Sequence, residues 1–470
     1  MADQAGPPRQ AGASEPVQQG TSRGEPARLR SLTLWQHGIS RRLSATRVCG
    51  NAIRPSSFRV SLPCSIGLVR VMSMPKGFRW SRLLLAAAVA GQAAACSSLP
   101  RTNYTQSEAE AATVPGMVGV RAYADAGAAD FVAMAAGPQK KRQAFTYLAL
   151  SGGGGDGAYG AGVLNGWTAS GKRPEFTIVS GVSTGALIAP FAFLGPAYDP
   201  YLTDIYTSGI ADSLVQSPSI ANVLFGSGLF GDGRLRNLIA RYVTPELLQA
   251  VAEEHAKGRR LLVVTTNLDT QRAVIWNMGA IAASGAPNAV SLFTDVLTAS
   301  ASIPAVFPPQ LLDVQAEGRA FQEMHVDGSV VTPVFTLPQS FLVRDGRFRS
   351  AGKADIYVVI NGRLEPEFEV TKNNTLSIVE KSFTTASRAR SRATLVATDV
   401  FARRNGMGFN LTYIDERAPQ TTTARGFDTA YMRSLYQFGY EAGRTGQFWQ
   451  PSVPAAPLVK NVVREAVAAR

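Results

Sequence analysis

The chain has 470 residues, of which 45% are hydrophobic and 17% charged, and its mean hydropathy is close to zero. The length predicts one large domain or about three smaller ones. The hydropathy excludes a polytopic membrane protein and a mostly disordered chain. The formal net charge is +13, but residues 1–82 hold 13 Arg or Lys against 3 Asp or Glu, whereas the other 388 hold 34 against 31. The bulk of the chain is nearly neutral, so we expect no nucleic-acid partner.

Cysteine and histidine are scarce in this sequence. The three cysteines end at Cys96, so no disulfide or thiolate metal site can form beyond that point. The three histidines are His37, His255 and His325, too few for a His-rich metal cluster. These counts exclude a His-rich metal cluster. Separately, we expect that the protein needs neither a metal nor an organic cofactor.

The first part of the chain has the composition of a targeting region. Residues 1–73 are rich in Pro, Gly, Ser, Gln and Arg, and we expect them to be disordered or a mis-assigned N-terminal extension. Residues 74–95 are predicted to be a signal peptide, because Lys76, Arg79 and Arg82 precede an uncharged run of 13 residues.

Cys96 directly follows three alanines, which resembles a bacterial lipobox, with Ala93 in place of the usual leucine. We expect Cys96 to be lipidated and to anchor the protein in the bacterial cell envelope, on the periplasmic face of the outer membrane. Ordinary signal-peptidase cleavage is one alternative, and an organellar transit peptide over residues 1–82 is another.

The rest of the chain is predicted to alternate strands and helices. Residues 96–143 are Ala-rich and polar, and are interpreted as a tether before a catalytic domain over 144–400 and a C-terminal extension over 401–470. Predicted strands cover 145–150, 176–180, 260–265 and 356–360, and predicted helices cover 158–170, 184–194, 376–402 and 427–445. This alternation is typical of an α/β fold with a central, mostly parallel sheet.

A glycine-rich loop follows the first predicted strand, with Gly152, Gly153, Gly154, Gly155 and Gly157 interrupted only by Asp156. Consecutive glycines let backbone N–H groups turn toward one point, and the positive end of the next helix dipole adds to them. Such a loop can hold a phosphate or an oxyanion. The Lys and Ser/Thr of a phosphate-binding P-loop are missing, the fit to a dinucleotide pattern is loose, and a plain tight turn remains the structural alternative.

Residues 181–185 read G-V-S-T-G and lie between a predicted strand and a predicted helix. This is the context of a nucleophile elbow, in which a sharp turn exposes the serine, here Ser183. Gly181 and Gly185 would allow the close packing that such a turn needs.

The general base is less obvious than the nucleophile. His37 lies in the presequence and His255 in a charged helical stretch, which leaves His325 as the histidine that could serve. A Ser–Asp dyad is the other option, because a positioned carboxylate with a suitable pKa can act as a base. Asp327, followed by Gly328, is the candidate carboxylate, although Asp-Gly is also a common turn.

Together these motifs resemble those of the patatin-like phospholipase family, and residues 299–309 resemble its A-S-x-x-I-P-x-x-F-P-P segment. The resemblance covers about 144–400. It implies a three-layer α/β/α fold and a lipid acyl hydrolase of the phospholipase A or lysophospholipase type, acting on phospholipid or another lipid ester. It assigns the nucleophile to Ser183, the base to Asp327 and the oxyanion hole to the glycine loop.

One position departs from the family pattern. Many members carry Arg or Lys where this chain has Asp156, and a carboxylate beside an oxyanion site would oppose the developing charge. Its side chain could instead cap the following helix, where a negative charge is favoured. The departure motivates a second hypothesis, a non-catalytic lipid-binding or envelope-structural lipoprotein on the same fold.

Overall fold

The computed structural model describes residues 101–135, 144–214, 233–343, 352–420, 427–446 and 448–455. The chain divides into two units, Met1–Lys76 and Gly77–Arg470, and every described residue belongs to the second. The predicted extension over 1–73, the signal peptide over 74–95 and Cys96 lie outside the described residues. No helix within the described ranges is both long enough and apolar enough to cross a membrane.

The described strands form one mixed sheet, whose main path runs β1-β5-β4-β3-β2-β8-β9. The five strands from β4 to β9 along this path are parallel to their neighbours, while β5 and β7 pair with β4 in the antiparallel sense and β6 pairs with β7. The strands are β1 (Arg121–Tyr123), β2 (Phe145–Leu150), β3 (Ile178–Val182), β4 (Arg260–Asn267), β5 (Arg272–Asn277), β6 (Gln310–Ala316), β7 (Arg319–Asp327), β8 (Ala354–Ile360) and β9 (Gly408–Tyr413).

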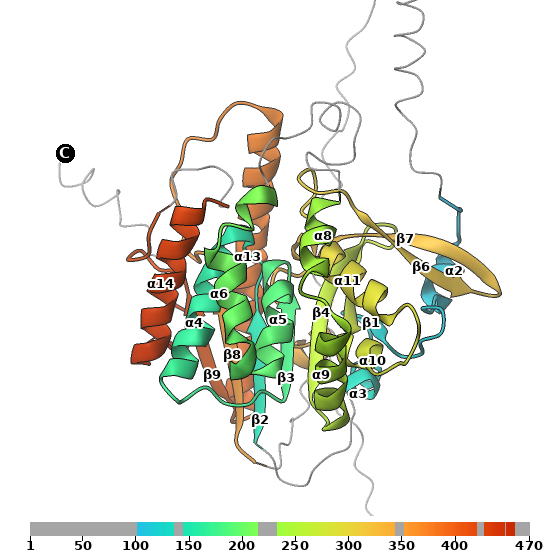
Figure 1. Ribbon diagram of the computed structural model, residues 1–470, viewed down its shortest axis with the longest axis horizontal. Coiled ribbons are helices and arrows are strands. Elements are labelled where there is room, and N and C mark those ends of the chain that lie inside the picture. The colour runs from blue at the N-terminus through green and yellow to red at the C-terminus, as the bar shows by residue number, and fades with distance from the viewer. Residues whose placement is uncertain are drawn as a thin grey trace, which may run out of the picture. The chain divides into compact units, whose positions relative to one another are not determined.

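Helices cover both faces of the sheet, which makes three layers (Figure 1). Because side chains alternate along a strand, Leu148 and Leu150 of β2 enter one core while Tyr147 and Ala149 enter the other. The first core is completed by α4 (Gly157–Ala169), α5 (Thr184–Leu194), α6 (Asp199–Thr207), α8 (Arg234–Ala240), α9 (Pro245–Ala256), α10 (Met278–Ala282), α11 (Ala289–Ser300) and α14 (Thr429–Thr445). The second is completed by α3 (Ala128–Ala135) and α13 (Thr375–Arg404).

The predicted α/β fold is confirmed, with a central block of parallel strands between helical layers. The strand predicted over 145–150 and the helix predicted over 184–194 have the predicted bounds, as β2 and α5. The bounds of the other predicted elements differ by one or two residues, as for β3, which begins at Ile178 instead of 176. The antiparallel strands β5, β6 and β7 were not predicted.

The segments on either side of the expected catalytic domain also contribute to this fold. Within the expected tether, residues 101–135 form α2 (Gln106–Ala111), β1 and α3, and β1 pairs with β5 at the edge of the sheet. Within the expected C-terminal extension, β9 pairs with β8, and α14 packs along α4. Thus the part of 96–143 that the structure describes is folded onto the sheet and is not a free tether.

Candidate active site

Ser183 occupies a sharp turn between β3 and α5. Its φ of 55° and ψ of −126° are unusual for a residue with a side chain, and such strain is retained mainly where the surrounding structure enforces it. The flanking glycines are required sterically. A Cβ added at Gly181 would lie 2.3 Å from the Gly185 carbonyl oxygen, and one added at Gly185 would lie 2.4 Å from the Leu150 carbonyl oxygen. The local geometry is that of the predicted nucleophile elbow.

The register of the sheet brings Asp327 to Ser183. Val182 pairs with Val264 of β4, and the next residue of β4, Thr265, pairs with Asp327 at the end of β7. Ser183 and Asp327, far apart in sequence, therefore flank the same position of β4. Gly328 allows this approach, because an added Cβ there would lie 2.4 Å from the Val264 carbonyl oxygen.

The Asp327 carboxyl is 1% exposed. Burial raises the pKa of Asp327 to about 6, and the nearby Ser183 hydroxyl and Ser329 limit this rise. The Ser329 N–H donates to Oδ1 at 2.7 Å, whereas Oδ2 is buried and has no hydrogen-bond partner among the described residues. Asp327 can thus approach the serine hydroxyl with an oxygen that no other group occupies.

Two hydrogen bonds hold the backbone of the elbow in place. The Ser183 N–H donates to Ser300 Oγ at 3.0 Å, and the Ser300 hydroxyl donates to the Val264 carbonyl at 2.7 Å. Ser300 belongs to the 299–309 segment that resembles the family pattern, but no role of its hydroxyl was predicted from the sequence. Because the Ser183 N–H is already engaged, oxyanion donors must come from elsewhere.

The glycine loop lies beside the nucleophile and begins α4. An added Cβ at Gly152 would lie 3.1 Å from Ser183 Cβ. The Gly152 N–H donates to the Pro333 carbonyl at 3.0 Å, and the Gly157 N–H donates within the loop to the carbonyls of Gly154 and Gly155. The expectation that Gly152 and Gly157 donate to an oxyanion therefore needs correction, since both of these N–H groups are committed.

The N–H groups of the three central glycines remain for this purpose. Within the described residues, no hydrogen bond engages the N–H of Gly153, Gly154 or Gly155. Gly154 has a φ of 59°, which favours glycine, and an added Cβ at Gly153 would lie 1.9 Å from the Asn361 carbonyl. The loop thus presents three adjacent donors at the positive end of α4.

Asn361, at the end of β8, holds the base of this loop. Its Nδ2 donates to the Ser151 carbonyl at 2.8 Å, its backbone N–H donates to Ser151 Oγ at 2.8 Å, and its Oδ1 accepts the Gly160 N–H at 3.1 Å. Sequence reasoning missed Asn361, because its only signal is a polar residue directly after a buried strand.

Asp156 does not cap α4 as the sequence analysis suggested, since its side chain makes no capping hydrogen bond. Instead, Oδ1 accepts a hydrogen bond of 2.7 Å from the Tyr431 hydroxyl of α14. Burial raises the pKa of Asp156 to about 6, and the bond to Tyr431 lowers it. The carboxylate of the glycine loop is thus directed toward the C-terminal helix.

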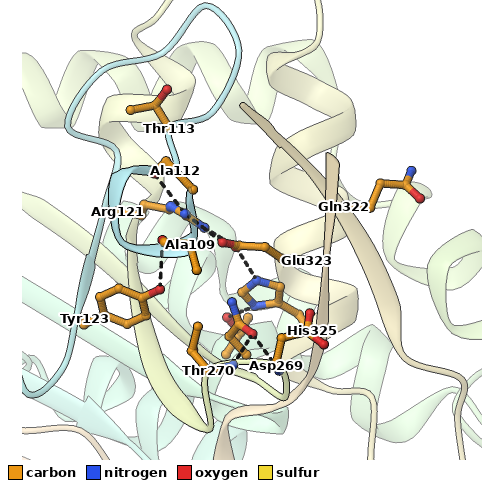
Figure 2. A network of polar contacts seen from close by, with 12 residues as sticks. Ala109, Ala112, Thr113, Arg121, Tyr123, Asp269, Thr270, Gln322, Glu323 and His325 are labelled. Atoms are coloured by element: carbon orange, nitrogen blue, oxygen red, sulfur yellow. Dashed lines mark hydrogen bonds and ion pairs between the residues drawn. The ribbon is translucent and has the colours of Figure 1, made fainter. Parts of the chain in front are cut away.

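His325 belongs to a different buried network, shown in Figure 2. Its Nδ1 lies 2.9 Å from Thr265 Oγ1 and its Nε2 lies 3.1 Å from Glu323 Oε2. Glu323 also forms an ion pair with Arg121 of β1. Burial lowers the pKa of His325, although Glu323 opposes that shift. Both ring nitrogens are engaged away from Ser183, which disfavours a Ser-His-Asp triad.

No group of three or more His, Cys, Asp or Glu side chains in the described part of the chain is arranged to hold a metal ion. His255, the other described histidine, packs at the start of α10, where an added Cβ at Gly279 would lie 2.4 Å from its Nδ1.

Comparison with known proteins finds that part of this chain is similar to one family. Residues 148–338 match the family model described as patatin-like phospholipase. No curated protein matches the chain significantly. Among solved structures, the crystal structure of VipD from Legionella pneumophila is similar at 13% identity and a TM-score of 0.30, over 65% of this chain and 67% of that one. Such a low TM-score carries no argument, so the assignment rests on the family match.

Proposed function

This chain carries a patatin-like phospholipase domain over residues 148–338, and we propose that it hydrolyses lipid esters with a Ser183–Asp327 dyad. Lipid hydrolysis is the activity of the family. The dyad and its roles are our proposal, and the observation that carries them is the buried Asp327 carboxyl with an unoccupied oxygen next to a serine in a strained turn.

In the first half of the reaction, Ser183 Oγ attacks the ester carbonyl carbon and its proton passes to Asp327. The N–H groups of Gly153, Gly154 and Gly155 stabilise the oxyanion of the tetrahedral intermediate. A single well-placed donor of this kind contributes about 3–4 kcal/mol in other enzymes. The intermediate collapses, the C–O bond to the alcohol breaks, and the alcohol leaves with the proton from Asp327.

In the second half, water attacks the acyl-enzyme while Asp327 accepts one of its protons. The ester bond to Ser183 breaks, the proton returns to Oγ, and a free carboxylic acid is released.

Asp327 must be ionised to start either half. With its pKa near 6, we expect kcat/KM to fall as the pH drops below about 6.

Substitution of each dyad residue tests this proposal. Ser183→Ala should abolish ester hydrolysis and labelling by a fluorophosphonate probe, and Asp327→Asn should reduce both by at least about 10³-fold, since the serine loses its base. Asp313→Asn is the matched control, because Asp313 is exposed on β6 and its carboxylate, among the described residues, bonds only to Gln322. Folded wild-type protein that neither labels at Ser183 nor cleaves a lipid panel would instead support the non-catalytic lipid-binding hypothesis.

His325→Gln separates the dyad from a triad. Because the ring nitrogens of His325 are bound to Thr265 and to Glu323, its substitution should lower stability more than turnover. Turnover normalised to probe-labelled sites should stay within a few-fold of wild type. A loss equal to that of Asp327→Asn would refute the dyad.

We further propose that a lipidated Cys96 anchors the enzyme to the cell-envelope membrane, on the periplasmic face of the outer membrane. The support is the sequence pattern at 74–96 and the lipid substrate that the family implies. A multiply acylated cysteine would anchor stably, whereas one acyl chain alone would not. The intact mass of the purified mature protein should show an N-terminal acylated cysteine. An unmodified mass, or a mature N-terminus elsewhere, would contradict this anchor.

A further inference from the structure

Helix α14 lies beside α4 (Figure 1), and glycines on both helices let their backbones approach closely. Glycines four residues apart line both sides of the contact. An added Cβ at Gly162 or Gly166 of α4 would lie 2.0 Å from a backbone oxygen of α14, and one at Gly439 or Gly443 of α14 would lie 2.3 Å from a backbone oxygen of α4. Backbone-to-backbone contact therefore fixes the position of α14 relative to α4.

This packing places the first turn of α14 over the glycine loop. Asp428 caps the helix by accepting the Tyr431 N–H at 2.8 Å. The Tyr431 hydroxyl then donates to Asp156 Oδ1, and the Phe427 ring lies 3.7 Å from an added Cβ at Gly154. The loop is thus held on one side by Asn361 and on the other by α14.

The Asp156 carboxyl makes no other side-chain hydrogen bond that the described residues show. Arg363 and Glu367 act on it through charge, in opposite directions, and Tyr431 is the group that donates to it. A hydrogen bond to an ionised acceptor is about twice as strong as a neutral one. Asp156 immediately follows the three glycines with free N–H groups, so its orientation affects the direction of those donors.

We infer that Tyr431 is a positioning residue for the oxyanion loop, acting through its hydrogen bond to Asp156. This inference rests on the proposed function. In this chain, a tyrosine–carboxylate pair connects α14 to the glycine loop. The pair turns the negative side chain toward α14, away from the developing oxyanion, and fixes the donors of Gly153, Gly154 and Gly155.

The experiment is a double-mutant cycle on the full chain, with kcat and KM measured per probe-labelled site. Tyr431→Phe and Asp156→Ala should each lower kcat about tenfold with KM within about twofold, because misplaced donors weaken binding of the transition state alone. The double variant Tyr431→Phe/Asp156→Ala should be no worse than either single variant. Asp156→Asn should keep most activity, since the amide oxygen of the asparagine can still accept a hydrogen bond from the Tyr431 hydroxyl.

Tyr436→Phe is the matched control. Tyr436 lies on the same helix, and its hydroxyl bonds to Asn165 of α4 and Thr203 of α6 instead of to the loop. It should change thermal stability as much as Tyr431→Phe does while leaving kcat near the wild-type value.

Three outcomes would overturn the positioning role: additive losses in the double variant, an Asp156→Asn variant as poor as Asp156→Ala, or an equal fall of kcat in Tyr436→Phe. A wild-type protein that fails to label at Ser183 would refute the proposed function itself. That result is distinguishable, because the positioning test compares only variants of a labelled enzyme.

Discussion

Asp327 combines two requirements that oppose each other. As the proposed base it must carry a charge, yet it is 1% exposed, and burial penalises the charged form. The Ser183 hydroxyl and Ser329 offset only part of that penalty, which leaves the pKa near 6. The protein therefore keeps at its centre a carboxylate that destabilises the fold at neutral pH.

The stability of Asp327→Asn should reveal this cost. An unfolded Asp has a pKa of about 3.9, so between pH 4 and 6 the folded state holds a proton that the unfolded chain has lost. Wild-type stability thus falls as the pH rises through that range, and the whole cost is present above it. At pH 8, the free energy of unfolding of Asp327→Asn should exceed that of wild type by at most about 3 kcal/mol, so the variant should unfold at a higher temperature. At pH 4 the two proteins should be nearly equally stable.

Thermal unfolding at the two pH values measures that difference. The exposed Asp313→Asn variant serves again as the control and should follow the wild type at both. A variant Asp327→Asn that is less stable than wild type at pH 8 would show that the ionised carboxyl stabilises the fold instead.

Sequence alone identified the residues that carry short local motifs. Ser183, Asp327 and the loop glycines come together as the motif order suggests, although their chemical roles remain predictions. Sequence did not reveal which N–H groups of the loop are already bonded, nor that Ser300 and Asn361 hold the site. The contacts of Ser300 with Ser183 and of Asn361 with Ser151 join residues more than a hundred positions apart, and only the tertiary structure shows them.

At the scale of elements, prediction succeeded where burial is complete on both faces. β2 and β8 are continuous apolar runs between turn signals, which is typical of strands in the middle of a parallel sheet. The antiparallel strand β6 alternates buried and exposed residues from Leu312 to Ala316, and this period-two pattern is typical of a half-buried strand. β1 has three residues and no pattern, and its strand conformation depends on pairing with β5.

The contact between α4 and α14 gives a prediction for helices. Gly166→Ala would place a methyl group 2.0 Å from the Tyr440 carbonyl, so α14 would have to move. The higher helix propensity of alanine contributes about 1 kcal/mol in its favour, but overpacking of this kind costs about 1–3 kcal/mol or more. We expect a lower Tm in thermal unfolding. Ser434→Ala, on the exposed side of α14, should not lower it, and an unchanged Tm for Gly166→Ala would contradict the close packing.

For the molecule as a whole, residues outside the predicted catalytic boundaries belong to the same layered fold. Arg121 of β1 forms an ion pair with the buried Glu323, whose pKa is lowered to about 2 because His325 and Arg121 outweigh the effect of burial. Removal of one partner from a buried pair leaves an uncompensated charge. Composition could not predict this, because an Ala-rich polar segment resembles a linker until the ion pair between Arg121 and Glu323 is seen in the structure.

The meeting of Ser183 and Asp327 across β4 also has a kinetic consequence. Neither residue is near the other until β3, β4 and β7 have all paired in register, and these strands are distant in sequence. Long-range pairings of this kind form slowly, because chain-closure entropy must be overcome before the contacts stabilise them. During refolding, helical signal should therefore recover before the serine becomes reactive, and serine reactivity should report that β3, β4 and β7 have paired in register.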